Sequence, residues 1–324
     1  MKFVIYGVGA IGGTLATRLV LSGYEVAGIA RKQHCDAING SGLTLKTPHV
    51  TETARFSCYL DPADVSFGPN DIIFLTMKTQ DCQPALERLR LAGVRDQAIV
   101  CAQNGVANEQ YALRLFPNVY GLMLMMPTTY MVPGQVNAFG SPKPGIFDIG
   151  RYPAGLDETV VTIVEALNAS NFVAFAHQRV MQAKYSKLLL NLGNIVGAVL
   201  GSDADSGEIS GRMRDEGEAV LRAANIEFGD VGAKNSLRDK LMQDMPIKGE
   251  ERIGSSSTQS LARQTGTIET DYLNGEIVLL GRLHNVPTPV NTYFCSLAQH
   301  MVNNAILPGS ISLQQVQKEI AALG

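Results

Sequence analysis

The chain has 324 residues, of which 45% are hydrophobic and 18% are charged, a composition typical of a globular protein with buried cores. At about 100–200 residues per domain, the length fits two domains. The formal net charge of -3 offers no cationic surface for nucleic acid or for an anionic membrane, and no apolar run approaches the ~20 residues of a membrane helix.

The first apolar run, which ends at Gly7, is too short for the core of a signal peptide. The five cysteines are scattered, odd in number and never spaced C-x-x-C, which favours reduced thiols. The five histidines show no metal-ligand spacing. We therefore expect a cytoplasmic protein without a metal ion.

The chain begins with a strand–helix–strand pattern. An apolar run at 2–6 is followed by a glycine-rich turn, a helical pattern at 14–22 that stops at Gly23, and a second apolar run at 25–30. This is a βαβ unit. Further strands are expected at 71–76, 98–102, 119–126, 135–139, 146–149 and 171–175, and a helix at 157–169.

The pattern changes after His177, where strand-type runs stop. Helices are expected at 178–200, 208–225, 230–244, 257–283, 289–305 and 312–323. We predict an α/β protein in which a Rossmann-type doubly wound sheet (1–177) is followed by an all-α C-terminal domain (178–324).

The turn after the first strand has the pattern G-x-G-x-x-G. It comprises Gly7, Val8, Gly9, Ala10, Ile11 and Gly12. In a dinucleotide site the first glycine allows the tight turn, the second lets the backbone approach the pyrophosphate, and the third lets the helix pack on the strand. The helix N-terminus also attracts the anion. Because the motif lies between a strand and a helix, we prefer this interpretation to an ordinary βα turn.

The end of the second strand indicates which dinucleotide binds. A site for NAD has an acidic residue there, whereas this strand is followed by Arg31 and Lys32. Two cations suit a 2′-phosphate, so we expect NADP(H), although both could be solvated surface residues. Two further strands end at Lys78 and Asn104, where a side chain can contact the cofactor or the substrate, or be an ordinary loop residue.

The helix expected at 178–200 is apolar over most of its surface. Its polar residues form one stripe, Lys184, Lys187, Asn191 and Asn194. A narrow solvent-facing stripe is one explanation. Asparagine is a poor helix former, however, and a ligand facing the stripe would explain both asparagines.

Farther along the chain, Ser257 and Glu269 lie twelve residues apart. Individually they suit a helix cap and a surface acid. Together with the polar stripe they suit a reduction site, in which hydride attacks a ketone and the carbonyl oxygen needs a cation and a proton. Lys187 can supply both, and Glu269 can hold its ammonium group. Asn191, Asn194 and Ser257 can bind carboxylate and hydroxyl oxygens.

With these residues the chain resembles the ketopantoate reductase (2-dehydropantoate 2-reductase) family over nearly its whole length. The resemblance rests on the glycine motif, Arg31, Lys78, Asn104-Gly105, Lys187-x-x-x-Asn191, Ser257 and Glu269-x-Asp271-Tyr272-x-Asn274-Gly275. It implies NADPH-dependent reduction of 2-dehydropantoate to pantoate, a step toward coenzyme A. It assigns the general acid to Lys187, substrate binding to Asn191, Ser257 and Glu269, and cofactor binding to Arg31, Lys78 and Asn104. It also implies a homodimer.

The chain departs from the family pattern in three ways. Ile195 occupies the place of a second helical asparagine, with Asn194 one residue earlier. The residues after Ser257 are changed to Thr258, Gln259 and Ser260, and the lysine helix carries an extra Lys184. The changes surround the substrate. A related reductase for another branched or bulkier 2-keto acid is therefore an alternative, and a non-catalytic NADP-binding protein is a third hypothesis.

Overall fold

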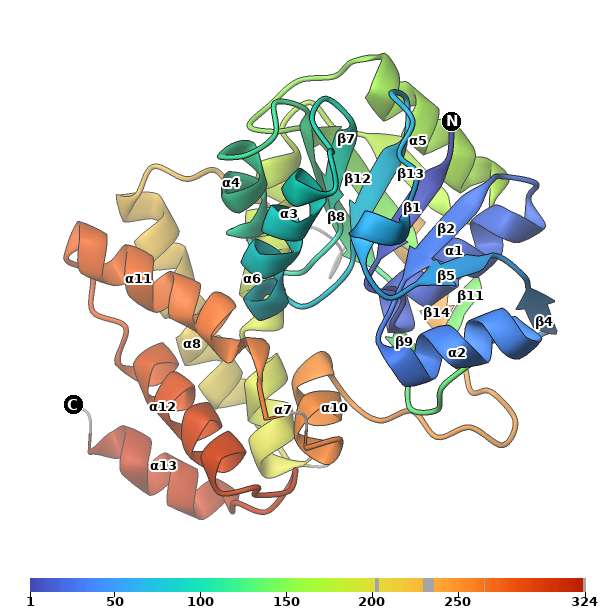
Figure 1. Cartoon of the computed structure of the whole chain (residues 1–324). Helices are drawn as coiled ribbons and strands as arrows, with labels where there is room; N and C mark the ends of the chain where they lie inside the picture. Colours follow the sequence, from blue (N-terminus) through green and yellow to red (C-terminus); the bar gives the residue numbers. More distant parts are fainter. Residues whose placement is uncertain (202–203, 230–235, 265, 323–324) are drawn as a thin grey trace. The chain divides into compact units, whose positions relative to one another are not determined.

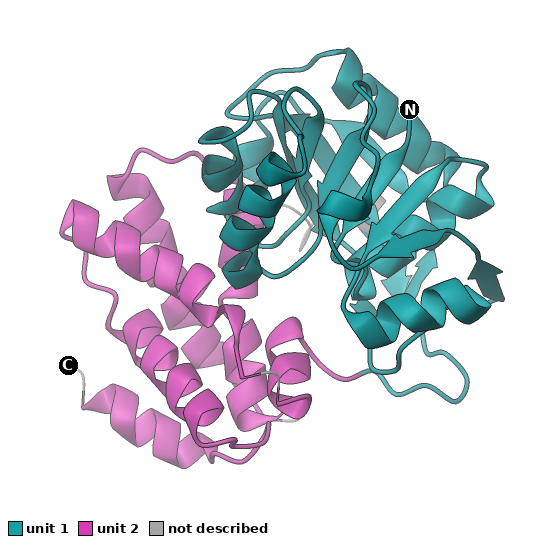
Figure 2. Ribbon diagram, in the orientation of Figure 1, with its two compact units in different colours: residues 1–184, 230–252 teal, residues 185–229, 253–324 magenta. Residues whose placement is uncertain are grey.

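The computed structural model describes residues 1–201, 204–229, 236–264 and 266–322. The chain forms two compact units (Figures 1 and 2). Unit 1 contains residues 1–184 and 230–252, and unit 2 contains residues 185–229 and 253–324. Unit 1 therefore extends past His177 and includes the later segment 230–252. These units are defined by contacts within the fold, and the domain limits 1–177 and 178–324 stay a prediction.

Unit 1 is built on an eight-stranded sheet with the order β13-β12-β8-β7-β6-β1-β2-β5. The strands are β1 (Phe3–Tyr6), β2 (Val26–Ile29), β5 (Ser57–Tyr59), β6 (Ile72–Leu75), β7 (Ala98–Cys101), β8 (Val119–Met125), β12 (Ile146–Arg151) and β13 (Val173–Ala176). From β5 to β8 all neighbours are parallel, whereas β12 runs antiparallel to β8. The order reverses between β1 and β6. A ligand is expected at the carboxyl ends of the strands beside this reversal.

Both faces of this sheet are covered, which explains why its central strands are continuous apolar runs. Alternate residues enter two separate cores. Phe3, Ile5 and Phe74 belong to one core, and Val4 and Ile73 to the other. The covering helices are α1 (Ala10–Leu21), α2 (Lys32–Ser41), α3 (Cys82–Leu91), α4 (Asn108–Leu113) and α5 (Glu158–Ala169).

Unit 1 also carries two small sheets. One has the order β4-β3-β10-β9, and the other pairs β11 with β14. Their strands are β3 (Leu43–Lys46), β4 (Thr51–Ala54), β9 (Thr128–Thr129), β10 (Gln135–Ala138), β11 (Gly140–Pro142) and β14 (Met242–Asp244). The helix expected at 230–244 is wrong at its end. Residues 230–235 lie outside the described residues, α9 covers Ser236–Leu241, and β14 follows because it pairs with β11.

The described residues of unit 2 form helices only. They are the second part of α6 (Val180–Asn191), α7 (Asn194–Leu200), α8 (Gly207–Ala223), α10 (Ser256–Ala262), the 3-10 helix η3 (Glu269–Tyr272), α11 (Asn274–His284), α12 (Pro289–Asn303) and α13 (Leu313–Ala321). The single helix predicted at 257–283 is wrong, since α10, η3 and α11 are separate elements. Within the described residues, no helix is long and apolar enough to cross a membrane.

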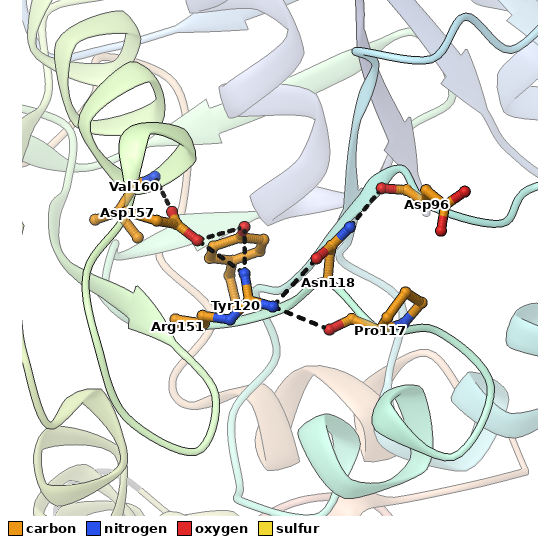
Figure 3. A network of polar contacts seen from close by, with 7 residues as sticks. All are labelled: Asp96, Pro117, Asn118, Tyr120, Arg151, Asp157 and Val160. Carbon is orange, nitrogen blue, oxygen red and sulfur yellow. Dashed lines mark hydrogen bonds and ion pairs between the residues drawn. The ribbon is translucent and has the colours of Figure 1, made fainter.

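One ion pair and its hydrogen bonds join the amino end of β8 to the carboxyl end of the antiparallel strand β12. Arg151 binds Asp157 at 2.8 Å and the side chain of Asn118 at 3.2 Å, and the Tyr120 hydroxyl donates to Asp157 at 2.9 Å (Figure 3). The other Asp157 oxygen accepts the Val160 N–H, which caps α5. This network stabilises the edge of the sheet opposite the expected ligand edge.

Candidate active site

The turn between β1 and α1 fits a bound dinucleotide. Gly7 has φ +103°, and a Cβ at this position would lie 2.6 Å from the Met77 nitrogen. A Cβ on Gly12 would lie 2.5 Å from both the Gly7 oxygen and Thr76 Oγ1. Gly9 caps α1 without a side-chain hydrogen bond. The first N–H groups of this helix are therefore presented by bare backbone, which is the arrangement that binds a pyrophosphate.

The carboxyl end of β2 leads directly into α2. Arg31 is the N-cap residue of α2, its side chain is 87% exposed, and it lies 3.2 Å from the Asp81 carboxylate. The neighbouring Lys32 pairs with Asp36 on the same helix. Arg31 is thus placed at the edge where a ribose phosphate is expected, and an exposed carboxylate competes for it.

The turns after β6 and β7 are joined to each other. Asn108 donates through Nδ2 to Thr79 Oγ1 at 3.0 Å and to the Asn104 carbonyl at 3.5 Å. Lys78 caps the short helix that contains Thr79. The predicted cofactor residues Lys78 and Asn104 therefore lie on two turns that are connected by a buried hydrogen bond.

Several buried polar atoms at this edge have no hydrogen-bond partner. They are Gln103 Oε1, Asn104 Oδ1, Asn108 Oδ1 and Glu109 Oε2. Leaving a buried polar group unpaired costs about 1–3 kcal/mol, so a cluster of such atoms indicates a place that a ligand completes. Asn104 was among the predicted residues. Gln103 precedes it at the same predicted strand end but was given no role, and Asn108 and Glu109, in the following helix, were not predicted.

A buried ion pair lies beneath the turn after β7. Lys184 donates to Glu109, and it also donates to the carbonyl oxygens of Gln103 at 3.1 Å and Cys101 at 3.4 Å. Burial raises the pKa of the Glu109 carboxyl, while the Lys184 ammonium opposes the shift. The sequence placed Lys184 on a polar stripe. In the structure it is buried, and its partner, 75 residues away in the chain, was not predicted.

In unit 2, α6 carries the predicted proton donor. Lys187 is half-buried, and Asn191 follows one turn later with an exposed fraction of 8%. Asn191 Nδ2 is buried without a partner. An unpaired amide donor beside a lysine is suited to an anionic or carbonyl oxygen of a ligand.

The continuous helix predicted at 178–200 is interrupted between α6 and α7. The Leu192 carbonyl at the interruption accepts a hydrogen bond from the buried Asn274 at 3.1 Å. Asn194 therefore begins a new helix, and its carbonyl accepts from Ser255 at 3.0 Å. Ile195, the residue in place of the family's second asparagine, is buried with 1% exposed.

The predicted residues Ser257 and Glu269 are both buried, at 3% and 8% exposed. Ser257 is the second residue of α10, and the neighbouring Ser255 caps that helix by accepting from Thr258. Ser255 also binds α7, so Ser257 belongs to the helix pair that contains Asn194. Glu269 begins η3, directly before α11.

A buried network in unit 2 fixes these elements. Asn274 donates to Asn291 at 3.0 Å, and Asn291 donates to Glu216 at 2.7 Å. The Glu216 carboxylate accepts the backbone N–H groups of Val290 and Asn291 at the start of α12. A carboxylate at a helix N-terminus is stabilised by the helix dipole. The element that begins with Glu269 is thereby tied to the interruption after α6.

Two family models cover most of the chain. Residues 3–154 match the model described as "Ketopantoate reductase PanE/ApbA", and residues 179–302 match its C-terminal model. The chain belongs to the ketopantoate reductase family. It is therefore an oxidoreductase of the 2-dehydropantoate 2-reductase type, built as the sequence predicted from an α/β Rossmann-like part and a helical part.

Individual relatives agree with this family assignment. The 2-dehydropantoate 2-reductase of Pyrococcus horikoshii is 26% identical over 311 residues, which are 92% of this chain and 97% of the relative. That of Caulobacter vibrioides is 27% identical over 308 residues, 91% of this chain and 97% of the relative. The crystal structure of a PanE/ApbA family ketopantoate reductase from Ralstonia eutropha matches with a TM-score of 0.78 and 26% identity, covering 94% of this chain and 99% of that one.

A further structure shares the fold. A D-mandelate dehydrogenase, solved with NADH and anilino(oxo)acetate, has a TM-score of 0.78 at 22% identity and covers 94% of this chain and 99% of its own. The ketopantoate reductase fold thus also occurs in a dehydrogenase of another 2-hydroxy acid.

Proposed function

We propose that the chain catalyses NADPH-dependent reduction of 2-dehydropantoate to pantoate, a step toward coenzyme A, with Lys187 as the general acid. The observation that carries the proposal is the unpaired, buried Asn191 amide one helical turn from Lys187. Family membership supplies the reaction class, and the glycine turn and Arg31 support NADP(H). The proposed reaction uses no metal ion and no nucleic-acid partner.

The cofactor, when bound, supplies hydride to the ketone carbon. The backbone N–H groups at the start of α1 bind its pyrophosphate, Arg31 pairs with its 2′-phosphate, and Lys78 and Asn104 contact its remaining polar groups. These roles agree with the unpaired Asn104 oxygen and with the open space at Gly9, where a Cβ would meet nothing closer than the Gly7 oxygen at 3.9 Å.

The substrate is held by residues of unit 2. Asn191, Ser257 and Asn194 bind its carboxylate and hydroxyl oxygens, and Lys187 Nζ carries the proton that the carbonyl oxygen takes up. Glu269 keeps the ammonium group charged and binds the substrate hydroxyl. The charge of Lys187 stabilises the oxygen as negative charge develops on it.

The first test follows the loss of reduced-nicotinamide absorbance with 2-dehydropantoate and either NADPH or NADH. We expect turnover with NADPH and at least about tenfold lower kcat/KM with NADH, since an Arg31–phosphate bond is worth ~1.5–3 kcal/mol. Equal rates with both cofactors would contradict the role of Arg31. The D-mandelate dehydrogenase that binds NADH makes this control necessary.

Lys187→Ala tests the proton donor. We expect kcat to fall by about 10²–10⁴-fold while the NADPH dissociation constant stays within about twofold, because Lys187 acts on the substrate oxygen. Lys187→Arg keeps the charge and tests whether a cation alone is sufficient. A variant that retains kcat within about threefold of the wild type would remove Lys187 from the mechanism.

The departures from the family pattern at Ile195 and Thr258 motivate a second candidate, reduction of another branched or bulkier 2-keto acid. An apolar side chain in place of an amide favours an apolar substrate group by about 1–3 kcal/mol per methylene-sized contact. A panel of 2-keto acids decides between the candidates. The highest kcat/KM for 2-dehydropantoate supports the first candidate, and a higher value for another 2-keto acid supports the second.

A further inference from the structure

The Lys184–Glu109 ion pair is the most deeply buried charged contact that the described residues form. The two side chains are 2% and 0% exposed. Transferring two charges from water to a protein interior often costs more than their mutual attraction returns. A contribution to stability is therefore a poor explanation for the pair. The backbone carbonyls that Lys184 contacts suggest a role in positioning the chain.

Lys184 contacts the chain at the end of β7 and just beyond it. An ammonium group has three N–H donors, and here they meet Glu109, the Gln103 carbonyl and the Cys101 carbonyl. Carbonyls two residues apart point to the same side of an extended chain. Lys184 thus links the carbonyl of Cys101, the last residue of β7, to that of Gln103, where the chain begins to bend.

The residue that follows Gln103 is Asn104, whose buried Oδ1 has no partner. The next residue, Gly105, turns the chain with φ +80°. The position of the Asn104 amide therefore depends on where the Gln103 carbonyl is held. A shift of the turn by about 1 Å would misplace the amide, and errors of this size can cost ~10²-fold in rate.

The neighbouring strand leaves room for the ion pair. A Cβ on Gly121 of β8 would lie 3.5 Å from Glu109 Oε1, 3.6 Å from Lys184 Cδ and 3.0 Å from Val180 Cγ1. The absence of a side chain at Gly121 lets α6 approach the sheet closely enough for Lys184 to reach β7. The pair, the glycine and the turn form one local arrangement within unit 1.

We propose that Lys184 and Glu109 are positioning residues that set the Asn104 turn for the bound nicotinamide dinucleotide. The inference rests on the proposed function, which places the cofactor at this edge. Neither residue touches the cofactor in this proposal. Both act through the backbone of Gln103 and Asn104.

Three variants test the proposal: Lys184→Met, Glu109→Gln and the double variant. Four quantities are measured: Tm, the NADPH dissociation constant by fluorescence titration, kcat, and amide hydrogen exchange of residues 98–108 in the cofactor-free protein. In Lys184→Met we expect NADPH binding and kcat to weaken by ~10- to 10²-fold and exchange across the turn to become faster.

The double variant separates positioning from stability, because it leaves no unpaired buried charge. We expect it to recover most of the wild-type Tm while NADPH binding stays weakened by about tenfold or more. Recovery of both Tm and NADPH binding to within about twofold of the wild type would show that the pair is only structural, and would overturn the proposal. If a single variant does not fold, the double variant alone decides.

Arg151→Met is the matched control, because it removes an ion pair from the opposite edge of the same sheet. It is expected to lower Tm without changing NADPH binding. If the wild type binds NADPH but reduces no 2-keto acid, the proposed reaction fails while the binding and exchange measurements still decide the role of the pair. If the wild type binds no NADPH, both proposals fail.

Discussion

The two edges of the central sheet differ in how their buried polar groups are paired. At the amino edge, both Asp71 oxygens accept backbone N–H groups, from Lys2 and Gly68, at 2.9 and 2.8 Å. The Arg151–Asp157 network completes this edge. At the carboxyl edge, buried oxygens of Gln103, Asn104 and Asn108 have no partner. The paired edge contributes stability, and the unpaired edge retains groups that a ligand can complete.

Among the substitutions that compare the two edges, Gly12→Ala, at the carboxyl edge, is expected to have the largest effect. The new Cβ would lie 2.5 Å from the Gly7 oxygen and 2.9 Å from Ile5 Cγ2, so the glycine turn must shift. NADPH binding should weaken by about 10- to 100-fold, because hydrogen bonds to a charged group are worth ~1.5–3 kcal/mol. Titration of NADPH fluorescence measures the change.

Gly40→Ala is the control for that substitution, since a Cβ on Gly40, in α2, meets nothing within 4 Å. It should leave NADPH binding unchanged and raise the unfolding free energy by up to ~1 kcal/mol. Equal NADPH affinities for Gly12→Ala and the wild type would show that the turn does not contact the cofactor.

Asp71→Ala, at the amino edge, should lower stability and leave NADPH binding unchanged. It leaves the N–H groups of Lys2 and Gly68 without their acceptor, so the unfolding free energy should fall by about 2 kcal/mol. NADPH binding should stay within about twofold of the wild type. Urea unfolding and NADPH titration of the same variant check both expectations. A large loss of binding would show that the two edges are coupled.

His34, at the carboxyl edge, makes the unfolding free energy depend on pH. Burial lowers its pKa from 6.5 to about 4, and its Nδ1 accepts the Gly134 N–H at 2.9 Å. As the pH falls, His34 therefore takes up a proton at a higher pH in the unfolded chain than in the folded protein. The stabilisation is complete above the unfolded pKa of 6.5 and is lost as the pH falls toward 4.

We expect the wild type to lose about 1–2 kcal/mol more unfolding free energy than His34→Gln between roughly pH 7 and pH 5. The glutamine can still accept a hydrogen bond but does not titrate. Urea unfolding at the two pH values measures the difference. Parallel losses in the two proteins would mean that His34 is not buried in its neutral form.

Local sequence patterns predicted the features that depend on neighbouring residues. The glycine turn, the strand ends at Lys78 and Asn104, and Ser257 near the start of a helix follow from spacing within one element. The interruption at 192–193 was not predicted. Gly193 lies at the break, but whether a helix continues past a glycine depends on tertiary contacts, and here Asn274 binds the Leu192 carbonyl from 82 residues away.

Contacts between distant residues explain the other differences from prediction. Residues Met242–Asp244 are a strand because they pair with Gly140–Pro142, and no local pattern contains that partner. Lys184 has helical spacing from Lys187, yet its environment is set by Glu109. Periodicity identifies a polar stripe. Only the fold shows which of its members face a ligand and which pair within the protein.

The smallest predicted effect concerns Asp81, which competes for Arg31 at the carboxyl edge. The Arg31–Asp81 pair is exposed, at 87% and 49%, so it is worth at most about 1 kcal/mol. If Arg31 binds the 2′-phosphate, Asp81→Asn should tighten NADPH binding by about two- to fivefold and leave NADH binding unchanged. Glu87→Gln, which removes the exposed Arg90 pair on α3, should change neither affinity. An equal gain for both cofactors would place Arg31 away from the phosphate, because only NADPH carries the group for which Asp81 competes.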